Sequence, residues 1–347
     1  MDIYYSPRQA NHSPDTFLVR GRPVPSPEST ERAERLLAAL QDAGLDVTQH
    51  PGDGSARLLQ RLETVHRPRY LEFLHTIHER WQTLPNASDT VLPNVHQTGG
   101  GHHYPAHPVG QAGWHLHDMA CPIGPHSFEG IFASVASAEM AAEAVLDGAR
   151  EAYALCRPPG HHAGPESAGG FCFVNNSALA ASILRERFAR VAVVDVDLHH
   201  GNGTQDIFYR RGDVWTGSVH ADPDQFYPFF WGSADERGED AGEGCNLNVP
   251  LPVGSGGNAF MQGLEHLLEA FQAYHAEAVV IALGLDAHKD DPLAGMTLET
   301  ADYARIGERL ARLPQPCVIV QEGGYPTPAL GQNLLAFLQA FTDTRRG

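Results

Sequence analysis

Residues 191–203 read VAVVDVDLHHGNG, an apolar run that passes directly into carboxylates and imidazoles. The β-branched residues at its start predict a buried strand. Burying Asp195, Asp197 and His199 without partners would cost a large amount of free energy. We therefore expect this strand to end in a functional site.

Four other segments also run from apolar residues into chemically active side chains. They are AYALCRPPGHH (152–162), WTGSVH (215–220), AVVIALGLDAH (278–288) and CVIVQEGGY (317–325). In an open parallel sheet, ligands bind beyond the carboxyl ends of the strands, so all five segments can contribute to one site. Helical spacing of apolar residues separates these strands, as crossover connections require. The predicted helices are 31–44, 70–82, 132–148, 175–189, 260–275, 300–312 and 328–342, with Gly44 and Gly148 as C-terminal caps. We expect an α/β fold.

Length and composition indicate one domain spanning residues 1–347, because no linker or composition break divides the chain. The stretch 83–127 interrupts the pattern with Pro, Gly and many histidines, including GGGHHYPAHP, and is predicted to be a long functional or interface loop. The N-terminus MDIYYSPRQA lacks the features of a secretory signal, and no apolar run is long enough to cross a membrane. We expect a soluble, cytoplasmic protein.

Charge and cysteine content exclude several classes of function. The formal net charge of -18 argues against nucleic acid or anionic membrane as a partner. It favours a cationic substrate, although an acidic surface also serves solubility. The cysteines show no CxxC pair, so we expect buried thiols and no disulfide framework or zinc knuckle. They are Cys121, Cys156, Cys172, Cys245 and Cys317.

Asp197 and His199, two positions apart at a strand end, can offer one oxygen and one nitrogen to a divalent cation. Asp286 ends a second apolar strand and offers a third ligand. Three protein ligands with a position left for water are typical of a catalytic metal site. The alternative is a hydrogen-bonded polar cluster that closes the strand.

The adjacent histidines His161 and His162 follow a Pro/Gly turn that can aim both rings at one point. Imidazole suits proton transfer near neutral pH. Asp195 could hold the ring of His161, and Asn202 that of His162, which would fix their tautomers. A surface turn with two exposed histidines is the alternative.

Tyr325 follows two glycines at the end of the run CVIV. The glycines allow an unusual backbone path, so the phenol could lie over the site and donate a hydrogen bond to developing negative charge. Packing is the alternative role for this tyrosine.

Five motifs, in this order and at these separations, closely resemble the zinc-dependent histone deacetylase superfamily, especially its bacterial acetylpolyamine amidohydrolase branch. They are RPPGHHA (157–163), GGFCFVNN (169–176), DVDLHHGNGTQDIFY (195–209), LGLDAHKDDPLAG (283–295) and EGGY (322–325). The resemblance implies the arginase/deacetylase fold, a central parallel eight-stranded sheet flanked by helices on both faces.

The resemblance also implies roles for individual residues. Zn²⁺ would be held by Asp197, His199 and Asp286, a ligand set that Fe²⁺ also tolerates. His161 and His162 would be the catalytic pair, supported by Asp195 and Asn202, and Tyr325 would polarise the carbonyl. A structural K⁺ is expected near Asp195, Asp197, His199 and Ser218. Phe171, with Gly170, would line the substrate channel opposite an aromatic among Phe226, Tyr227, Phe229 and Phe230.

The expected reaction is hydrolysis of an acetylated amine by a metal-activated water. Deacetylation of acetyl-lysine in proteins or peptides is the first alternative. An arginase-like ureohydrolase would need acids for a second metal, where this chain has Gly201 and His288. A binding module that has lost the chemistry is a further alternative, which an acetate-release assay with and without chelator would identify.

The stretch 83–127 resembles an insertion of the acetylpolyamine branch, and it affects which substrate is expected. In the acetylpolyamine branch it builds a homodimer, and its carboxylates help to recognise the distal ammonium groups of the substrate. Here no acid lies between Asp89 and Asp118, and Val109 and Ala120 stand where acids are expected. Asp118 could substitute from a neighbouring turn. Acetylated cadaverine or putrescine, a bulkier acetylated metabolite and acetyl-lysine peptides all remain open.

Overall fold

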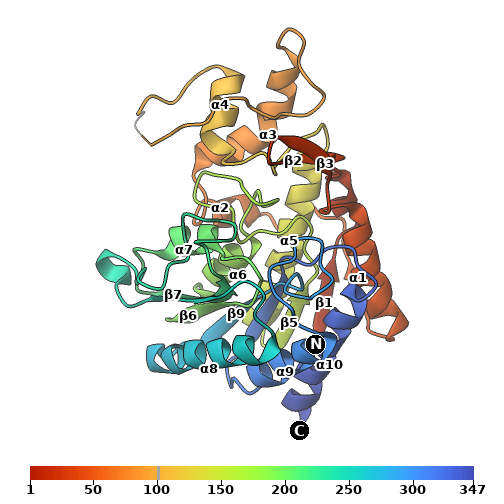
Figure 1. Cartoon of the computed structure of the whole chain (residues 1–347), viewed down its shortest axis with the longest axis vertical. Helices are drawn as coiled ribbons and strands as arrows, with labels where there is room; N and C mark the ends of the chain where they lie inside the picture. The colour runs from red at the N-terminus through yellow and green to blue at the C-terminus, as the bar shows by residue number, and fades with distance from the viewer. Residues whose placement is uncertain (100–101) are drawn as a thin grey trace.

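The computed structural model describes residues 1–99 and 102–347. Gly100 and Gly101, in the glycine run of the predicted loop, lie outside the described residues. A parallel eight-stranded sheet forms the centre, in the order β4-β1-β5-β10-β9-β6-β7-β8 (Figure 1). The strands are β1 (Asp2–Tyr5), β4 (Thr48–Gln49), β5 (Glu151–Ala154), β6 (Val191–Asp195), β7 (Val214–Ala221), β8 (Asn246–Leu251), β9 (Ala278–Leu283) and β10 (Cys317–Gln321). This confirms the predicted α/β fold with its parallel sheet.

The central strands are covered on both faces, which explains their continuous apolar sequences. Every residue of β6 is buried. Its alternate side chains enter two different apolar clusters, with Val193 in one and Ala192 and Val194 in the other. Two helical layers therefore sandwich the sheet.

One layer holds α2 (Leu58–Leu62), α3 (Pro68–Gln82), α5 (Ser127–Leu146) and α6 (Asn176–Leu184). The other holds α1 (Thr30–Asp42), α8 (Gly257–Tyr274), α9 (Thr300–Ala311) and α10 (Leu330–Arg346), and α7 (Asn202–Phe208) follows β6. All seven predicted helices are present, although α5 begins earlier and α6 ends earlier than the periodicity indicated. Gly44 and Gly148 have φ values of +72° and +113°, as the predicted caps require.

The predicted loop 83–127 is not free of regular structure, because it contains the helix α4 (Pro108–His115). The Nδ1 atom of His107 accepts a hydrogen bond from the backbone N–H of Val109 at 3.2 Å and so caps this helix. Figure 1 shows α4 and its flanking loops projecting at the end of the molecule opposite α8.

The antiparallel hairpin of β2 (Thr16–Val19) and β3 (Arg22–Pro25) was not predicted from the sequence. It contacts the end of the insertion, because the N–H of Leu18 donates to the carbonyl of Met119 at 3.5 Å. Short 3₁₀ turns at Pro7–Asn11 and Asp240–Gly242 complete the elements.

The cysteines are all free thiols, and four are buried as predicted, whereas Cys245 is partly exposed. Among the described residues, no helix combines the length and apolarity that crossing a bilayer requires.

Candidate active site

Asp197, His199 and Asp286 converge just beyond the carboxyl ends of β6 and β9, as the sequence predicted. The Nδ1 atom of His199 lies 3.0 Å from Oδ2 of Asp286 and 3.3 Å from Oδ1 of Asp197. The three side chains are buried, and their ligand atoms lie within 4.8 Å of one another. Burial, and then the charge of Asp197, raise the pKa of Asp286. Burial disfavours charge on His199, but Asp197 and Asp286 outweigh it and raise its pKa to about 9, so positive charge is favoured between the two carboxylates.

Gly323, two residues after the end of β10, lies directly beside the two carboxylates. Its N–H donates to Oδ2 of Asp197 at 2.7 Å. A Cβ atom at this position would lie 2.2 Å from Oδ2 of Asp286 and 2.5 Å from Oδ2 of Asp197. Only glycine therefore lets the backbone pass directly beside the two carboxylates.

The two histidines of the turn after β5 point toward this cluster. The Nδ1 atom of His161 lies 2.9 Å from Oδ2 of Asp195, and that of His162 lies 2.7 Å from Oδ1 of Asn202. The ring centroids of the two histidines are 4.1 Å apart, and both side chains are buried. The pairing predicted from the sequence is thus present in the structure.

The two rings have opposite electrostatic environments. Burial disfavours charge on His161, but Asp197 and Asp195 together outweigh it and raise its pKa to about 10. Burial, reinforced by the charges of His161 and His199, holds the pKa of His162 well below its usual value. His162 is therefore a neutral imidazole at pH 7, ready to accept a proton.

Tyr325 is also buried at the site, with 3% of its surface exposed. Its ring centroid lies 5.6 Å from that of Phe171, and its backbone N–H donates to Oδ2 of Asp291 at 3.0 Å. Burial raises the pKa of the Tyr325 phenol well above 10, so the hydroxyl keeps its proton and remains a donor.

Aromatic side chains surround the polar cluster. The ring of Tyr227 lies 5.0 Å from that of His162 and 6.1 Å from that of His199, so Tyr227 is the aromatic that faces the histidines. Phe226 stacks on His199 at 5.3 Å.

Two of the predicted channel residues lie further out. Phe229 and Phe230 are 54% and 81% exposed, so they lie at the surface, whereas His162 and His199 are buried.

Comparison with known proteins identifies the family to which this chain belongs. The family model described as histone deacetylase domain matches residues 26–341. The chain belongs to the histone deacetylase family. This confirms the resemblance and the predicted enzyme class, a hydrolytic deacetylase.

Individual relatives match nearly the whole chain. An acetylpolyamine amidohydrolase from Burkholderia pseudomallei is 42% identical over 99% of this chain and 100% of its own length. A protein of the same name from Mycoplana ramosa is 37% identical over 98% of this chain and 99% of its own length. The crystal structure of an acetylpolyamine aminohydrolase from Burkholderia pseudomallei matches with a TM-score of 0.94 and 41% identity, covering 99% of both chains.

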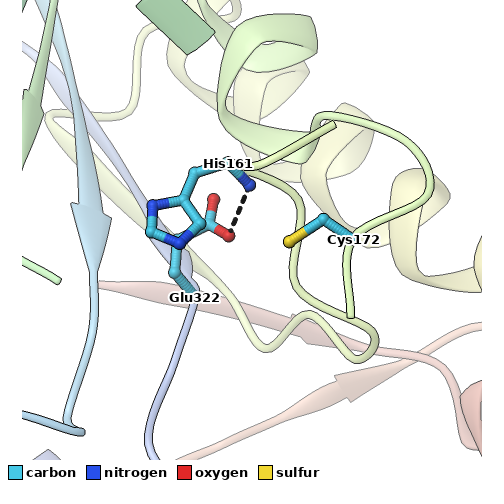
Figure 2. A group of neighbouring side chains, drawn as sticks. All are labelled: His161, Cys172 and Glu322. Atoms are coloured by element: carbon cyan, nitrogen blue, oxygen red, sulfur yellow. Dashed lines mark hydrogen bonds between the residues drawn. The ribbon is translucent and has the colours of Figure 1, made fainter. Parts of the chain in front are cut away.

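A second group of side chains of the types that bind metals consists of His161, Cys172 and Glu322 (Figure 2). The Oε2 atom of Glu322 accepts from the backbone N–H groups of Gly160 at 2.6 Å and His161 at 3.0 Å, and its Oε1 accepts from Ser177 Oγ at 2.5 Å. Because these bonds already occupy the carboxylate, Glu322 anchors the turn that carries His161 and His162 rather than offering a free metal ligand.

Sequence reasoning missed three residues of the deacetylase site: Glu322, Asp291 and Arg32. The Nε–H of Arg32 donates to the carbonyl of Gly324 at 2.6 Å, and its guanidinium lies 5.4 Å from the centroid of the Tyr325 ring. An acid at the end of an apolar strand was a usable signal for Glu322, and an arginine within the apolar face of α1 was one for Arg32.

Ser218 lies on β7 beside the site, where its Oγ is 2.8 Å from Nδ1 of His220. Asp195 and Ser218 both line a small buried cavity of about 10 Å³. Two of the residues predicted to surround a potassium ion therefore border the same space.

Proposed function

We propose that this chain is a metal-dependent amidohydrolase that removes acetyl groups from acetylated small amines of the polyamine class. The observation that carries the proposal is the convergence of Asp197, His199 and Asp286 beside a neutral His162 and a protonated Tyr325. The full-length similarity to proteins named acetylpolyamine amidohydrolase supports it.

The donor set fits a divalent metal. Two buried carboxylates and one imidazole are ligands that Zn²⁺ and Fe²⁺ accept, and the charge of a cation would relieve the repulsion between the acids. We propose Zn²⁺, with Fe²⁺ as the alternative. When bound, the ion would act as a Lewis acid that lowers the pKa of a water from about 15.7 towards about 7 and polarises the acetyl carbonyl.

His162 would accept the proton of the attacking water at Nε2 and later deliver it to the leaving amine. Asn202 accepts at Nδ1 of His162, which keeps that proton on Nδ1 and leaves Nε2 available. His161, held by Asp195, would remain charged and stabilise negative charge in the transition state. Tyr325 would donate its hydroxyl hydrogen to the oxyanion that forms from the acetyl carbonyl.

A polyamine-type substrate agrees with the chemistry of this chain. The net charge of -18 attracts cationic amines. Phe171 and Tyr227 provide aromatic surface beside the catalytic residues, and such surface can contact a slender methylene chain. The absence of acids between Asp89 and Asp118 keeps acetyl-lysine peptides as a second candidate substrate.

We also propose a single deacetylase domain that works in the cytoplasm as a homodimer joined through the 83–127 insertion. The free thiols suit a reducing compartment. A K⁺ ion beside Asp195 and Ser218 is part of the same proposal, since both residues border one buried cavity. Analytical ultracentrifugation of the purified chain would test the dimer.

The substrate proposal is tested by acetate release from N-acetylputrescine, N-acetylcadaverine, acetylspermidine and an acetyl-lysine peptide, compared by kcat/KM. We expect kcat/KM to be higher for the small acetylated amines than for the peptide. We also expect a chelator to abolish turnover. A peptide preference would assign the second candidate substrate. No acetate from any compound by metal-loaded protein would contradict the proposed activity.

A further inference from the structure

We propose that Asp118 is a positioning residue that joins two walls of the substrate channel, namely the segment around Gly170 and the segment around Tyr227. This inference rests on the proposed function. Its Oδ2 atom accepts from the N–H of Gly170 at 2.9 Å and from the hydroxyl of Tyr227 at 2.8 Å. Gly170 and Tyr227 lie far apart in the sequence. One carboxylate oxygen therefore joins two separate segments.

Both segments face the proposed general base. A Cβ atom on Gly170 would lie 2.4 Å from Cδ2 of His162, so the backbone of this wall passes directly beside the imidazole. The ring of Tyr227 stands edge-on to His162, with centroids 5.0 Å apart and planes at 89°. A change in the separation of the two walls would alter the space next to His162.

The Asp118 carboxylate is itself held in place. Its Oδ1 atom accepts from the N–H of Ala120 at 2.9 Å. The preceding residues are joined to the same wall, because the N–H of His117 donates to the carbonyl of Ala168 at 2.9 Å and the N–H of Ala168 donates to that of His115 at 2.8 Å. The insertion thus reaches the channel of its own chain through a short, fixed segment.

The pattern of donors distinguishes this role from recognition of a substrate ammonium. Each carboxylate oxygen has two lone pairs, and both of those on Oδ2 are occupied by internal donors. Burial, and then Asp118 itself, raise the pKa of Tyr227 well above 10, so its phenol remains a donor. Oδ1 accepts from Ala120 as well, so three of the four acceptor positions of Asp118 serve internal donors, and its main role would be to set the width of the channel.

Two substrates of equal length separate the two roles. N-acetylputrescine carries a distal ammonium, whereas N-acetylpentylamine replaces it with a methyl group. If Asp118 positions the walls, Asp118→Ala and Tyr227→Phe each lower kcat/KM about tenfold on both substrates, as expected for loss of a hydrogen bond to a charged group. The double variant should lose much less than the product of the two single losses.

Two further comparisons separate positioning from a general loss of stability. Asp118→Asn keeps an acceptor for Gly170 and Tyr227 and should recover most of the activity, while the control Asp224→Asn, an exposed acid, should behave as wild type. A bulky substrate, the N-acetyl derivative of cyclohexylmethylamine, should gain relative to N-acetylpentylamine in Asp118→Ala, because the walls can separate.

An effect of Asp118→Asn as large as that of Asp118→Ala, limited to N-acetylputrescine, would overturn the proposal and assign ammonium recognition. Hydrogen exchange at the Gly170 amide gives a readout independent of turnover. We expect exchange to quicken at least tenfold in Asp118→Ala and not in Asp224→Asn, and unchanged exchange would also overturn the proposal. If the wild type releases no acetate, the proposed function fails while the exchange measurement still decides the role of Asp118.

Discussion

The Nδ1 atom of His162 lies 2.7 Å from the Oδ1 atom of Asn202, so an amide orients this imidazole. The neighbouring His161 is instead held by the carboxylate of Asp195 at 2.9 Å. The amide fixes the tautomer of His162 without adding negative charge, while burial and the charges of His161 and His199 hold its pKa well below the usual value. The two histidines therefore differ in charge, and we propose different roles for them.

Asn202→Asp should raise the pKa of His162, because a carboxylate favours the charged imidazole. Protonated His162 cannot accept a proton from water, so activity grows as pH rises through this pKa. We expect the acidic limb of the kcat/KM profile to move to higher pH by about one unit. A profile that superimposes on that of the wild type would argue against His162 as the general base.

His162→Ala should lower kcat by about 10² to 10⁴, the usual contribution of positioned acid-base catalysis. Added imidazole should restore part of the rate by entering the space left by the side chain. His161→Ala should lose less and should not respond to imidazole. The reverse order of losses would exchange the roles assigned to the two histidines.

Tyr325→Phe should lower kcat by about 10² to 10³, equivalent to roughly 3 to 4 kcal/mol, because one donor to the oxyanion is lost. The fold should persist, which circular dichroism would check. Tyr274→Phe, which removes a hydroxyl that donates to the carbonyl of Gly212, serves as the control. Near-normal turnover in Tyr325→Phe would remove this phenol from the mechanism.

Acid should destabilise the fold through His66, which is buried with Nδ1 2.9 Å from the carbonyl oxygen of Gly164. Burial lowers its pKa to about 4 from the ordinary value of 6.5, so between these values the unfolded chain binds more protons. Its contribution to stability is complete above pH 6.5 and is lost as pH falls towards 4.

Urea unfolding of wild type and His66→Ala at pH 7.5 and 4.5 measures this contribution. The difference in unfolding free energy between the two proteins should shrink by about 2 to 3 kcal/mol at the lower pH. His266→Ala, which removes an exposed imidazole on α8, is the control. An equal difference at both pH values would contradict the assignment.

The cluster of Asp197, His199 and Asp286 could be predicted because its residues follow apolar strands whose order and parallel direction bring their ends together. Asp197 and Asp286 each interrupt such a run, and that interruption is visible without a structure. The strands β1 and β4, with four and two residues, carry too little periodicity to be recognised.

Other features depend on contacts between distant segments. Arg32 reaches Gly324 across 292 positions, and no local pattern connects the two. The hydrogen bonds of Asp118 to Gly170 and Tyr227 could not be predicted, because these residues become neighbours only in the fold. Composition likewise could not separate Tyr227, beside His162, from the exposed Phe230.

Metal content measured together with acetate release tests the central claim most directly. Purified active protein analysed by inductively coupled plasma mass spectrometry should contain about one divalent ion per chain. Asp286→Asn should lose both the ion and the turnover, while the exposed control Asp224→Asn should keep both. Wild-type protein that releases acetate at full rate with no stoichiometric metal would contradict the account.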